Sequence, residues 1–422
     1  MKSIGMSDEF QSFDQRAVIK VCGIGGGGGN AVGRMIEAGL AEVEFITINT
    51  DAQALKNSPA GVRLQIGLDL TGGLGSGAIP STGRQAAEED RERIKDVLRG
   101  ADMIFLTAGL GGGTGTGASP IVAEEATAAG ALTVAICTLP FGFEGKERME
   151  NAMRGLAELE EYVDTLIVVP NDRVAELSSN NISLLNAFRQ ADDVLYDGVR
   201  AITELITVPG LINLDFADVR TIMQRRGRAL MGIGAAQGED RAVKAAEQAI
   251  VCPLLEQSDI NGAMGVIVNI KGGCDITMRE VQSAVSAVKH AAATDANVIF
   301  GAVIDEDEQP EVQVTVIAAG FPRGAAELHS GDVPAAHPQE FETFTSAAPP
   351  MPPEPATPAP QPPPTREEQP VAEGPDEETD DGPAEQFLFP ETEDEPANPP
   401  KTSRNNSEGE HMDISGLLRQ RR

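Results

Sequence analysis

The chain has 422 residues, enough for two ordinary domains and additional sequence. Its formal net charge is −32, and so strong a negative field disfavours direct contact with nucleic acid or anionic lipid. Three of the four histidines lie in the acidic C-terminal part, and only His290 lies in the apolar-rich part, where we expect a surface or packing role. A Ser-His-Asp triad or a multi-histidine zinc site is therefore not expected.

Cysteines and hydropathy indicate the compartment. The four cysteines lie far apart without CxxC spacing, and we expect buried free thiols in a reducing environment. No apolar run reaches 18 residues, and residues 1–16 lack the apolar centre of a signal peptide. These features predict a cytoplasmic protein.

Short apolar strands alternate with helices over the first half of the chain. We expect strands at residues 17–22, 43–50, 101–109, 131–138 and 165–172. We expect helices from the first glycine run to about residue 38, over 81–99, from about 118 to 130, and over 146–162. This alternation is typical of an α/β fold whose parallel sheet is covered on both faces.

A second, smaller α/β domain is expected beyond a long helix at residues 192–208, which Pro209 and Gly210 end. It contains expected helices at 216–226, 239–250 and 277–293, and expected strands at 229–235, 264–270, 297–304 and 311–319. The segment DEDEQPE suggests a hairpin-like turn between the last two strands. The predicted boundaries are 1–16 for an N-terminal extension, 17–209 for the first domain with the central helix, and 210–322 for the second domain.

Order is expected to fail from residue 323 onward. Residues 325–410 hold 19 of the 28 prolines and 20 acidic against 3 basic residues. Such a segment buries too little apolar surface to offset the entropy of ordering its backbone. We therefore predict a disordered linker at 323–411, followed at 412–422 by a short segment with apolar and basic residues.

The first glycine run, GGGGGN at residues 25–30, lies between an expected strand and a helix. Glycines let a backbone approach a ligand closely, and a helix N-terminus directs free N–H groups at an anion. Gly23, Gly25 and Gly28 also fit GxGxxG, with Asp51 further on. This run alone leaves a dinucleotide, a mononucleotide and a merely structural turn as alternatives.

The second glycine run, GGGTGTG at residues 111–117, favours a single polyphosphate, because two loops at the carboxyl ends of parallel strands can converge on one. The hydroxyls of Thr114 and Thr116 can bond phosphate oxygens or a magnesium shell. No lysine follows the glycines, so backbone amides and a metal ion must neutralise the phosphates. We expect bulkier residues at Gly113 or Gly115 to exclude the ligand without unfolding the protein.

This second run resembles the signature loop of the tubulin/FtsZ family. Four further segments agree with that family: GGGGGNAV at 25–32, NTDAQAL at 49–55, FEGKERM at 143–149 and NLDFADVR at 213–220. The resemblance spans about residues 17–321. It implies a GTPase, with GTP and Mg²⁺ as cofactors, that assembles head-to-tail into filaments of the bacterial division ring at mid-cell. A dehydrogenase is disfavoured because it needs no second glycine loop, and a scaffold with little hydrolysis is disfavoured by the intact carboxylates described below.

The resemblance also implies which residues bind GTP. The phosphates would be held by the two glycine loops: Gly26, Gly27, Gly28, Gly29, Asn30, Gly113, Thr114 and Gly115. Glu144 and Arg148 would reach the ribose and phosphates, and Asn171 and Asp193 would face the guanine. An aspartate can accept from both the ring N–H and the exocyclic amine of guanine, which adenine cannot offer. The local alternative for Asp193 is the N-cap of the long helix, and one side chain could serve both uses.

Asn213, Asp215 and Asp218 follow the break at Pro209 and Gly210. Read locally, Asp215 is a helix N-cap and Asp218 a first-turn carboxylate that the helix dipole favours. The resemblance implies a catalytic role instead, in which this loop docks on the next subunit's nucleotide and orients the attacking water. Carboxylates suit such positioning, because hydrolysis depends on geometry and charge stabilisation.

The C-terminal segment 412–422 resembles the family's short peptide that binds membrane anchors and division regulators, so contact with the membrane would be indirect. Ser415 and Leu417 depart from the family pattern, which leaves the partner open. The alternative is a loose basic tail that touches anionic lipid weakly.

Overall fold

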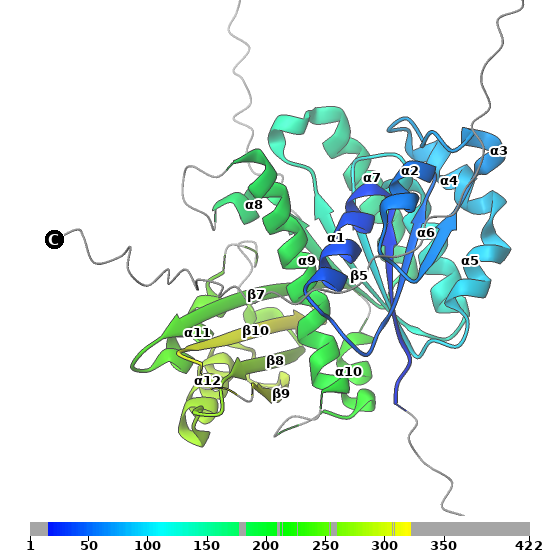
Figure 1. Cartoon of the computed structure of the whole chain (residues 1–422). Coiled ribbons are helices and arrows are strands. Elements are labelled where there is room, and N and C mark those ends of the chain that lie inside the picture. Colours follow the sequence, from blue (N-terminus) through cyan, green and yellow to red (C-terminus); the bar gives the residue numbers. More distant parts are fainter. Residues whose placement is uncertain are drawn as a thin grey trace, which may run out of the picture. The chain divides into compact units, whose positions relative to one another are not determined.

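The computed structural model describes residues 16–176, 183–208, 212, 214–225, 227–252, 254, 260–305, 307 and 309–321 (Figure 1). The expected linker at 323–411 and the expected peptide at 412–422 lie outside these residues, as does Asn213. None of the helices described is long and apolar enough to cross a membrane.

The described strands form one continuous sheet in the order β3-β2-β1-β4-β5-β6-β7-β10-β8-β9. Their bounds are β1 Ile19–Ile24, β2 Glu44–Asn49, β3 Val62–Gln65, β4 Met103–Gly109, β5 Leu132–Leu139, β6 Thr165–Pro170, β7 Gly227–Gln237, β8 Gly265–Gly272, β9 Asn297–Ile304 and β10 Glu311–Ala319. The first six strands of this order run parallel, and β1 and β5 are buried along their whole length. The α/β fold with a parallel sheet covered on both faces is therefore confirmed.

Helices cover both faces of the sheet (Figure 1). One buried apolar cluster packs α1 and α9 against one face, and a second packs α4, α5, α6 and α7 against the other. The helix bounds are α1 Gly25–Glu37, α2 Ala52–Asn57, α3 Leu68–Thr71, α4 Pro80–Glu89, α5 Arg91–Leu98, α6 Thr114–Ala128, α7 Lys146–Tyr162, α8 Asn171–Glu176, α9 Leu184–Thr207, α10 Phe216–Met223, α11 Arg241–Ile250 and α12 Met278–Ala291.

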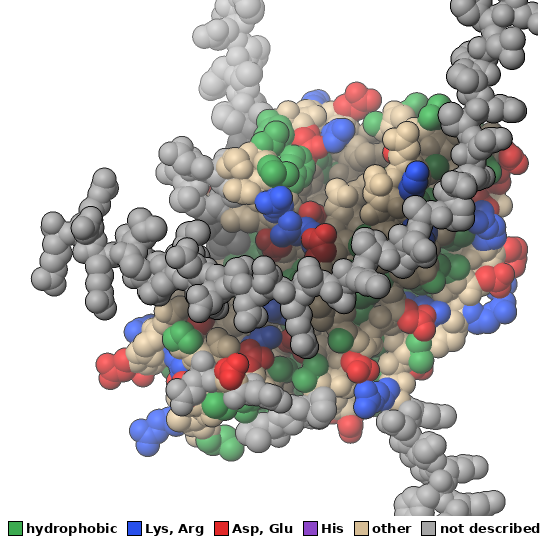
Figure 2. Space-filling view, in the orientation of Figure 1, with side chains coloured by type: hydrophobic (Ala, Val, Ile, Leu, Met, Phe, Trp, Pro, Cys, Tyr) green, Lys and Arg blue, Asp and Glu red, His purple; other side chains and the backbone are tan. Residues whose placement is uncertain are grey.

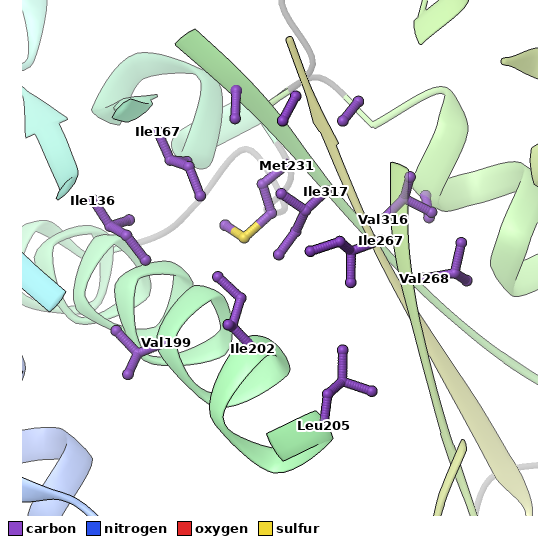
Figure 3. Close-up of a cluster of buried hydrophobic side chains, with 14 of the residues drawn as sticks. Ile136, Ile167, Val199, Ile202, Leu205, Met231, Ile267, Val268, Val316 and Ile317 are labelled. Atoms are coloured by element: carbon purple, nitrogen blue, oxygen red, sulfur yellow. The ribbon is translucent and has the colours of Figure 1, made fainter. Parts of the chain in front are cut away.

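Helix α9 joins the two halves of the sheet. Its apolar residues Val199, Ile202 and Leu205 are buried in one cluster with Ile136 of β5 and Met231 of β7 (Figure 3). The same cluster continues into the side chains of β8 and β10. Strand β6 also pairs in parallel with the start of β7, so backbone hydrogen bonds as well as side chains connect the halves.

The expected hairpin between the last two strands is wrong. Strand β8 lies between β9 and β10, parallel to β9 and antiparallel to β10. Local turn chemistry at residues 305–311 indicated reversal of the chain, but it could not show that a third strand occupies the space between.

Two expected helices also differ from the structure. The helix expected over 81–99 is two helices, because Asp90 leaves the helical path and its carboxylate accepts a hydrogen bond of 2.7 Å from Gly67 N. The long helix begins at Leu184 and not near residue 192, with Ser183 as its N-cap accepting from Asn186 N at 3.3 Å.

Lys20 is a buried cation on β1, 8% exposed. Its ammonium group donates hydrogen bonds of 3.0 Å to the carbonyls of Val97 and Arg99, at the C-terminal end of α5, and lies 3.3 Å from Glu44. A cation there satisfies orphan carbonyls and complements the helix dipole.

Three of the four cysteines are buried, as expected, whereas Cys274 is exposed. Burial raises the pKa of the Cys22 and Cys137 thiols to about 12, so both stay neutral at physiological pH. Their role is therefore apolar packing. His290 is exposed and hydrogen-bonds only to its own helix, at Ser286 O, among the contacts described.

Candidate nucleotide-binding and catalytic site

A cavity of about 640 Å³ lies at the carboxyl ends of β1, β2, β4, β5 and β6. We call it the glycine-lined cavity, because both glycine runs form part of its wall. Its size falls within the usual range of ligand pockets, roughly 300–1,000 Å³. The parallel order of the strands explains its position, since their carboxyl ends meet at one edge of the sheet.

The two glycine loops touch each other. A Cβ added to Gly25, whose φ is +71°, would lie 2.7 Å from Gly115 N, so no side chain fits between the loops. Helices α1 and α6 begin within these loops, at Gly25 and Thr114. Their first N–H groups have no intrahelical partners, and two such helix ends at one cavity favour an anionic ligand.

Few basic side chains are available to neutralise an anion in the glycine-lined cavity. Of the described residues that line it, Arg148 is the one cation. Its guanidinium donates to Glu144 at 2.5 Å, and Glu144 also accepts from Phe141 N at 3.0 Å. Peptide dipoles at the two helix N-termini would therefore supply most of the positive potential that a bound anion meets there.

The threonines of the second loop differ from each other. Hydrogen bonds join the Thr114 hydroxyl to those of Thr50 at 2.7 Å and Ser76 at 2.9 Å. The hydroxyl of Thr116 is buried and accepts from Gly111 N at 2.8 Å, and Thr116 does not line the cavity. Thr116 thus shapes the loop, contrary to the expectation that its hydroxyl faces the phosphates.

Gly113 and Gly115 are also required for packing. A Cβ on Gly113 would lie 2.2 Å from Ser76 Oγ and 2.8 Å from Ile79 N, and one on Gly115 would lie 2.7 Å from Gly109 O. These contacts contradict the expectation that larger residues there would affect only ligand binding.

A third glycine-rich segment, GGLGSGAI at residues 72–79, completes the wall near Thr114. Four of its residues line the cavity: Gly75, Ser76, Gly77 and Ala78. Ala78 has φ +60°, a backbone conformation that alanine rarely adopts. The glycine content of residues 72–79 was the signal for this part of the wall that the sequence analysis missed.

The opposite end of the cavity is lined by side chains: Asn30, Asn49, Asn171, Phe188 and Asp192. Asn171 is 5% exposed, and its Oδ1 has no hydrogen-bond partner among the described residues. A buried amide oxygen without a partner costs free energy unless a ligand satisfies it. Phe188 is 40% exposed and packs edge-on against Phe141, with 5.1 Å between ring centroids.

Asp192, and not Asp193, faces this end of the cavity. Asp193 does not line it, and its carboxylate instead accepts hydrogen bonds of 2.6 and 3.1 Å from Arg34 of α1. Because α9 begins at Leu184, Asp193 also lies well inside the helix and cannot be its N-cap. Burial raises the pKa of Asp192 to about 7, although the charge of Arg34 lowers it.

The structure thus brings most of the expected nucleotide residues to one cavity. Those that line it are Gly26, Gly27, Asn30, Gly113, Thr114, Gly115, Glu144, Arg148 and Asn171. Gly28 packs against β4 instead, where a Cβ would lie 2.2 Å from Thr107 O, and Gly29 lines an adjoining cavity of about 460 Å³.

The expected catalytic carboxylates lie elsewhere. Asp215 and Asp218 are exposed at the start of α10, and neither lines the glycine-lined cavity. Asp215 holds the N-cap position, but within the described residues its side chain makes no capping hydrogen bond. Arg220, also on α10, donates to Gly130 O at 3.3 Å, just beyond the C-terminal end of α6. Helix α6 has 15 residues, so the end that Arg220 contacts lies about 22 Å along the helix from the phosphate loop at its other end.

Metal ligands are sparse. Among the residues that the structure describes, no three His, Cys, Asp or Glu side chains gather where they could hold a metal ion.

Lys and Arg side chains are scattered among acidic ones over the described part of the face in Figure 2.

A parallel sheet with two glycine loops at one cavity, followed by a second α/β half, defines a tubulin-like GTPase. A model of the Tubulin/FtsZ family GTPase domain matches residues 18–179, and a model of the FtsZ family C-terminal domain matches residues 227–322. The chain is similar to FtsZ from M. jannaschii, with 44% sequence identity and a TM-score of 0.70 over 72% of this chain and 88% of that one. It shares its fold with CetZ2 from Haloferax volcanii, with 24% identity and a TM-score of 0.62 over 72% of this chain and 94% of that one.

The chain therefore belongs to the FtsZ family. Its GTPase domain binds guanine nucleotide and hydrolyses GTP.

Proposed function

We propose that this chain assembles head-to-tail into filaments of the bacterial division ring, and that each subunit hydrolyses the GTP of its neighbour. Asn213, Asp215 and Asp218 of one subunit would meet the nucleotide in the glycine-lined cavity of the next. The observation that supports this proposal is the separation within one chain: the two described carboxylates are exposed, neither lines the glycine-lined cavity, and their helix α10 contacts the end of α6 opposite the phosphate loop. A structure of the M. jannaschii relative is described as a dimer, and one of the H. volcanii relative as a protofilament, which supports self-association.

GTP would bind with its phosphates at the two helix N-termini and its base between Asn171, Phe188 and Asp192. The ionised carboxylate of Asp192 can accept from the ring N–H and the amine of guanine, and the Asn171 oxygen can accept a further bond. The Phe188 ring offers an apolar face to the base. Adenine has no donor at the corresponding ring position, so these acceptors favour guanine.

Mg²⁺ fits this cavity as an ion carried by the phosphates. Mg²⁺ keeps several waters and needs only one or two carboxylates beside phosphate oxygens, which agrees with the scarcity of clustered ligands among the residues that the structure describes. It would supply charge neutralisation at the phosphates. In the docked pair, Asp215 and Asp218 would hold the attacking water in line, since carboxylates accept hydrogen bonds from water.

A mixing experiment tests hydrolysis in trans. One variant, Asp218→Asn, keeps the cavity but loses the proposed catalytic carboxylate, and a second, Gly26→Val, keeps the catalytic loop but blocks the cavity. Each alone should release little phosphate from GTP. An equimolar mixture should recover activity, because half of the contacts between different subunits then pair an intact cavity with an intact loop. A mixture as inactive as its components, although both variants enter mixed filaments, would contradict the proposal.

The segment 412–422 would recruit membrane anchors and division regulators to the filament. The protein would then act in the cytoplasm, at mid-cell. Its Ile414, Leu417 and Leu418 have helical spacing, while eleven residues are too few for a stable isolated helix. We expect it to fold against an apolar groove of its partner.

A further inference from the structure

An ion pair joins α1 to α9 beside the base end of the cavity. Arg34 of α1 donates through two nitrogens to one oxygen of Asp193, at 2.6 and 3.1 Å. The side chains are 30% and 51% exposed, so the pair is only partly screened by solvent. Arg34 also lines the adjoining cavity, which shares Asn30, Phe188 and Asp192 with the glycine-lined cavity.

The neighbour of this pair in the chain is Asp192, whose carboxyl group faces the base end. Only the ionised carboxylate can accept two N–H groups from guanine, because a protonated carboxyl presents a donor in place of one acceptor. Two charges act on it in opposite directions: Arg34 favours the ionised form, and Asp193 disfavours it. Burial disfavours it further, and the pKa of Asp192 rises to about 7.

We propose that Arg34 is a positioning residue that keeps Asp192 ionised and so sets the pH range in which the site accepts guanine. This inference rests on the proposed role of Asp192 in recognising the base. Arg34 itself need not touch the nucleotide, because it acts on the carboxylate through its charge and through the position of α1 against α9.

Other charged groups face the two cavities, but they are compensated or exposed. Glu144 and Arg148 lie four residues apart and form an ion pair on one wall of the glycine-lined cavity. The Asp51 carboxylate caps α2 by accepting from Gln53 N and Ala54 N. Glu37 on α1 and Arg189 on α9 are exposed, so water screens their charges. The Arg34–Asp193 pair is therefore the charge arrangement that most directly controls Asp192.

The test measures GTP affinity between pH 5.5 and 8.5 for the full chain and four variants. Binding should weaken as the pH falls through the pKa of Asp192, because protonation removes an acceptor. Arg34→Met leaves Asp193 uncompensated beside Asp192 and should move the profile upward by about one pH unit, weakening binding about tenfold at pH 6. Asp193→Asn should move the pH profile of GTP affinity downward. Arg34→Lys keeps the positive charge and should show a profile close to that of the unmodified chain.

Asp192→Asn is the reference, because it cannot titrate and leaves only the pH dependence of the GTP phosphates. Structural damage would weaken binding at every pH and could not shift the two profiles in opposite directions. Unshifted profiles for Arg34→Met and Asp193→Asn, with a flattened profile for Asp192→Asn, would overturn the inference and leave the role of Asp192 intact. If Asp192→Asn keeps both the normal profile and the preference for GTP over ATP, the proposed role of Asp192 fails, and the inference fails with it.

Discussion

Alanine at two loop glycines should produce opposite effects. A Cβ on Gly26 would meet no protein atom within 4 Å, and Gly26 lines the glycine-lined cavity, so the added methyl group enters the ligand's space. A Cβ on Gly113 would lie 2.2 Å from Ser76 Oγ, so the methyl group collides with the protein itself. We expect Gly26→Ala to fold well and bind GTP poorly, and Gly113→Ala to be destabilised.

The magnitudes follow from these contacts. Gly26 has no unusual φ, so alanine there should stabilise the nucleotide-free protein by about 0.4–1 kcal/mol by restricting the unfolded chain. Overpacking at Gly113 should cost about 1–3 kcal/mol. The methyl group of Gly26→Ala would push the phosphate away from one loop N–H, and losing that hydrogen bond should cost about 1.5–3 kcal/mol of binding free energy, or roughly 10- to 150-fold in affinity.

Thermal melts without nucleotide and equilibrium GTP binding separate the two effects. Gly61→Ala is the matched control, because Gly61 has open space for a Cβ and lines neither cavity. It should stabilise the protein and leave GTP affinity unchanged. A Gly26→Ala variant that melts early would show that the space beside Gly26 is not open. One that binds GTP like the Gly61→Ala control would show that the phosphates do not occupy this space.

Three further results are expected. Lys20→Met removes the cation that caps α5 and should destabilise the protein by about 1.5–3 kcal/mol in urea unfolding, with GTP affinity unchanged. The hydrogen bond from Arg91 lowers the pKa of Glu124, so the ionised pair stabilises the fold at pH values above the ordinary carboxyl pKa. The free energy of unfolding that Arg91→Met loses should therefore shrink as the pH falls through about 4, which urea unfolding at several pH values would measure. Deletion of residues 412–422 should leave filaments and GTP hydrolysis intact in solution and abolish recruitment to the division site, and a truncated chain that still localises would contradict this.

Strand periodicity and glycine position predicted the parallel half of the fold from sequence. The buried apolar runs at β1, β4, β5 and β6 each precede a helix, and a continuous apolar run is what burial on both faces requires. The pairing of β8 between β9 and β10 could not be predicted, because it depends on contacts between segments distant in sequence.

The start of α9 decided which aspartate faces the cavity. From the sequence we expected the helix to start at Asp192. In the structure the preceding apolar residues Leu184, Leu185 and Phe188 are exposed, so they do not continue the buried apolar stripe of the helix. Ser183 as an N-cap was the missed signal. Once the helix extends back to Leu184, its 3.6-residue period turns Asp192 to the cavity and Asp193 to Arg34, a choice that adjacent identical residues cannot reveal in the sequence.

The two ends of the glycine-lined cavity differ in how they can respond to an inhibitor. The phosphate end consists largely of peptide groups, and their glycines cannot enlarge where neighbouring atoms lie within 3 Å, as at Gly113. A point mutation replaces a side chain but leaves the peptide N–H in place. The base end consists of side chains such as Asn171, Phe188 and Asp192, each open to replacement. Resistance to a competitor of GTP should therefore arise readily against compounds that bind the base end, and rarely against compounds held by the loop amides.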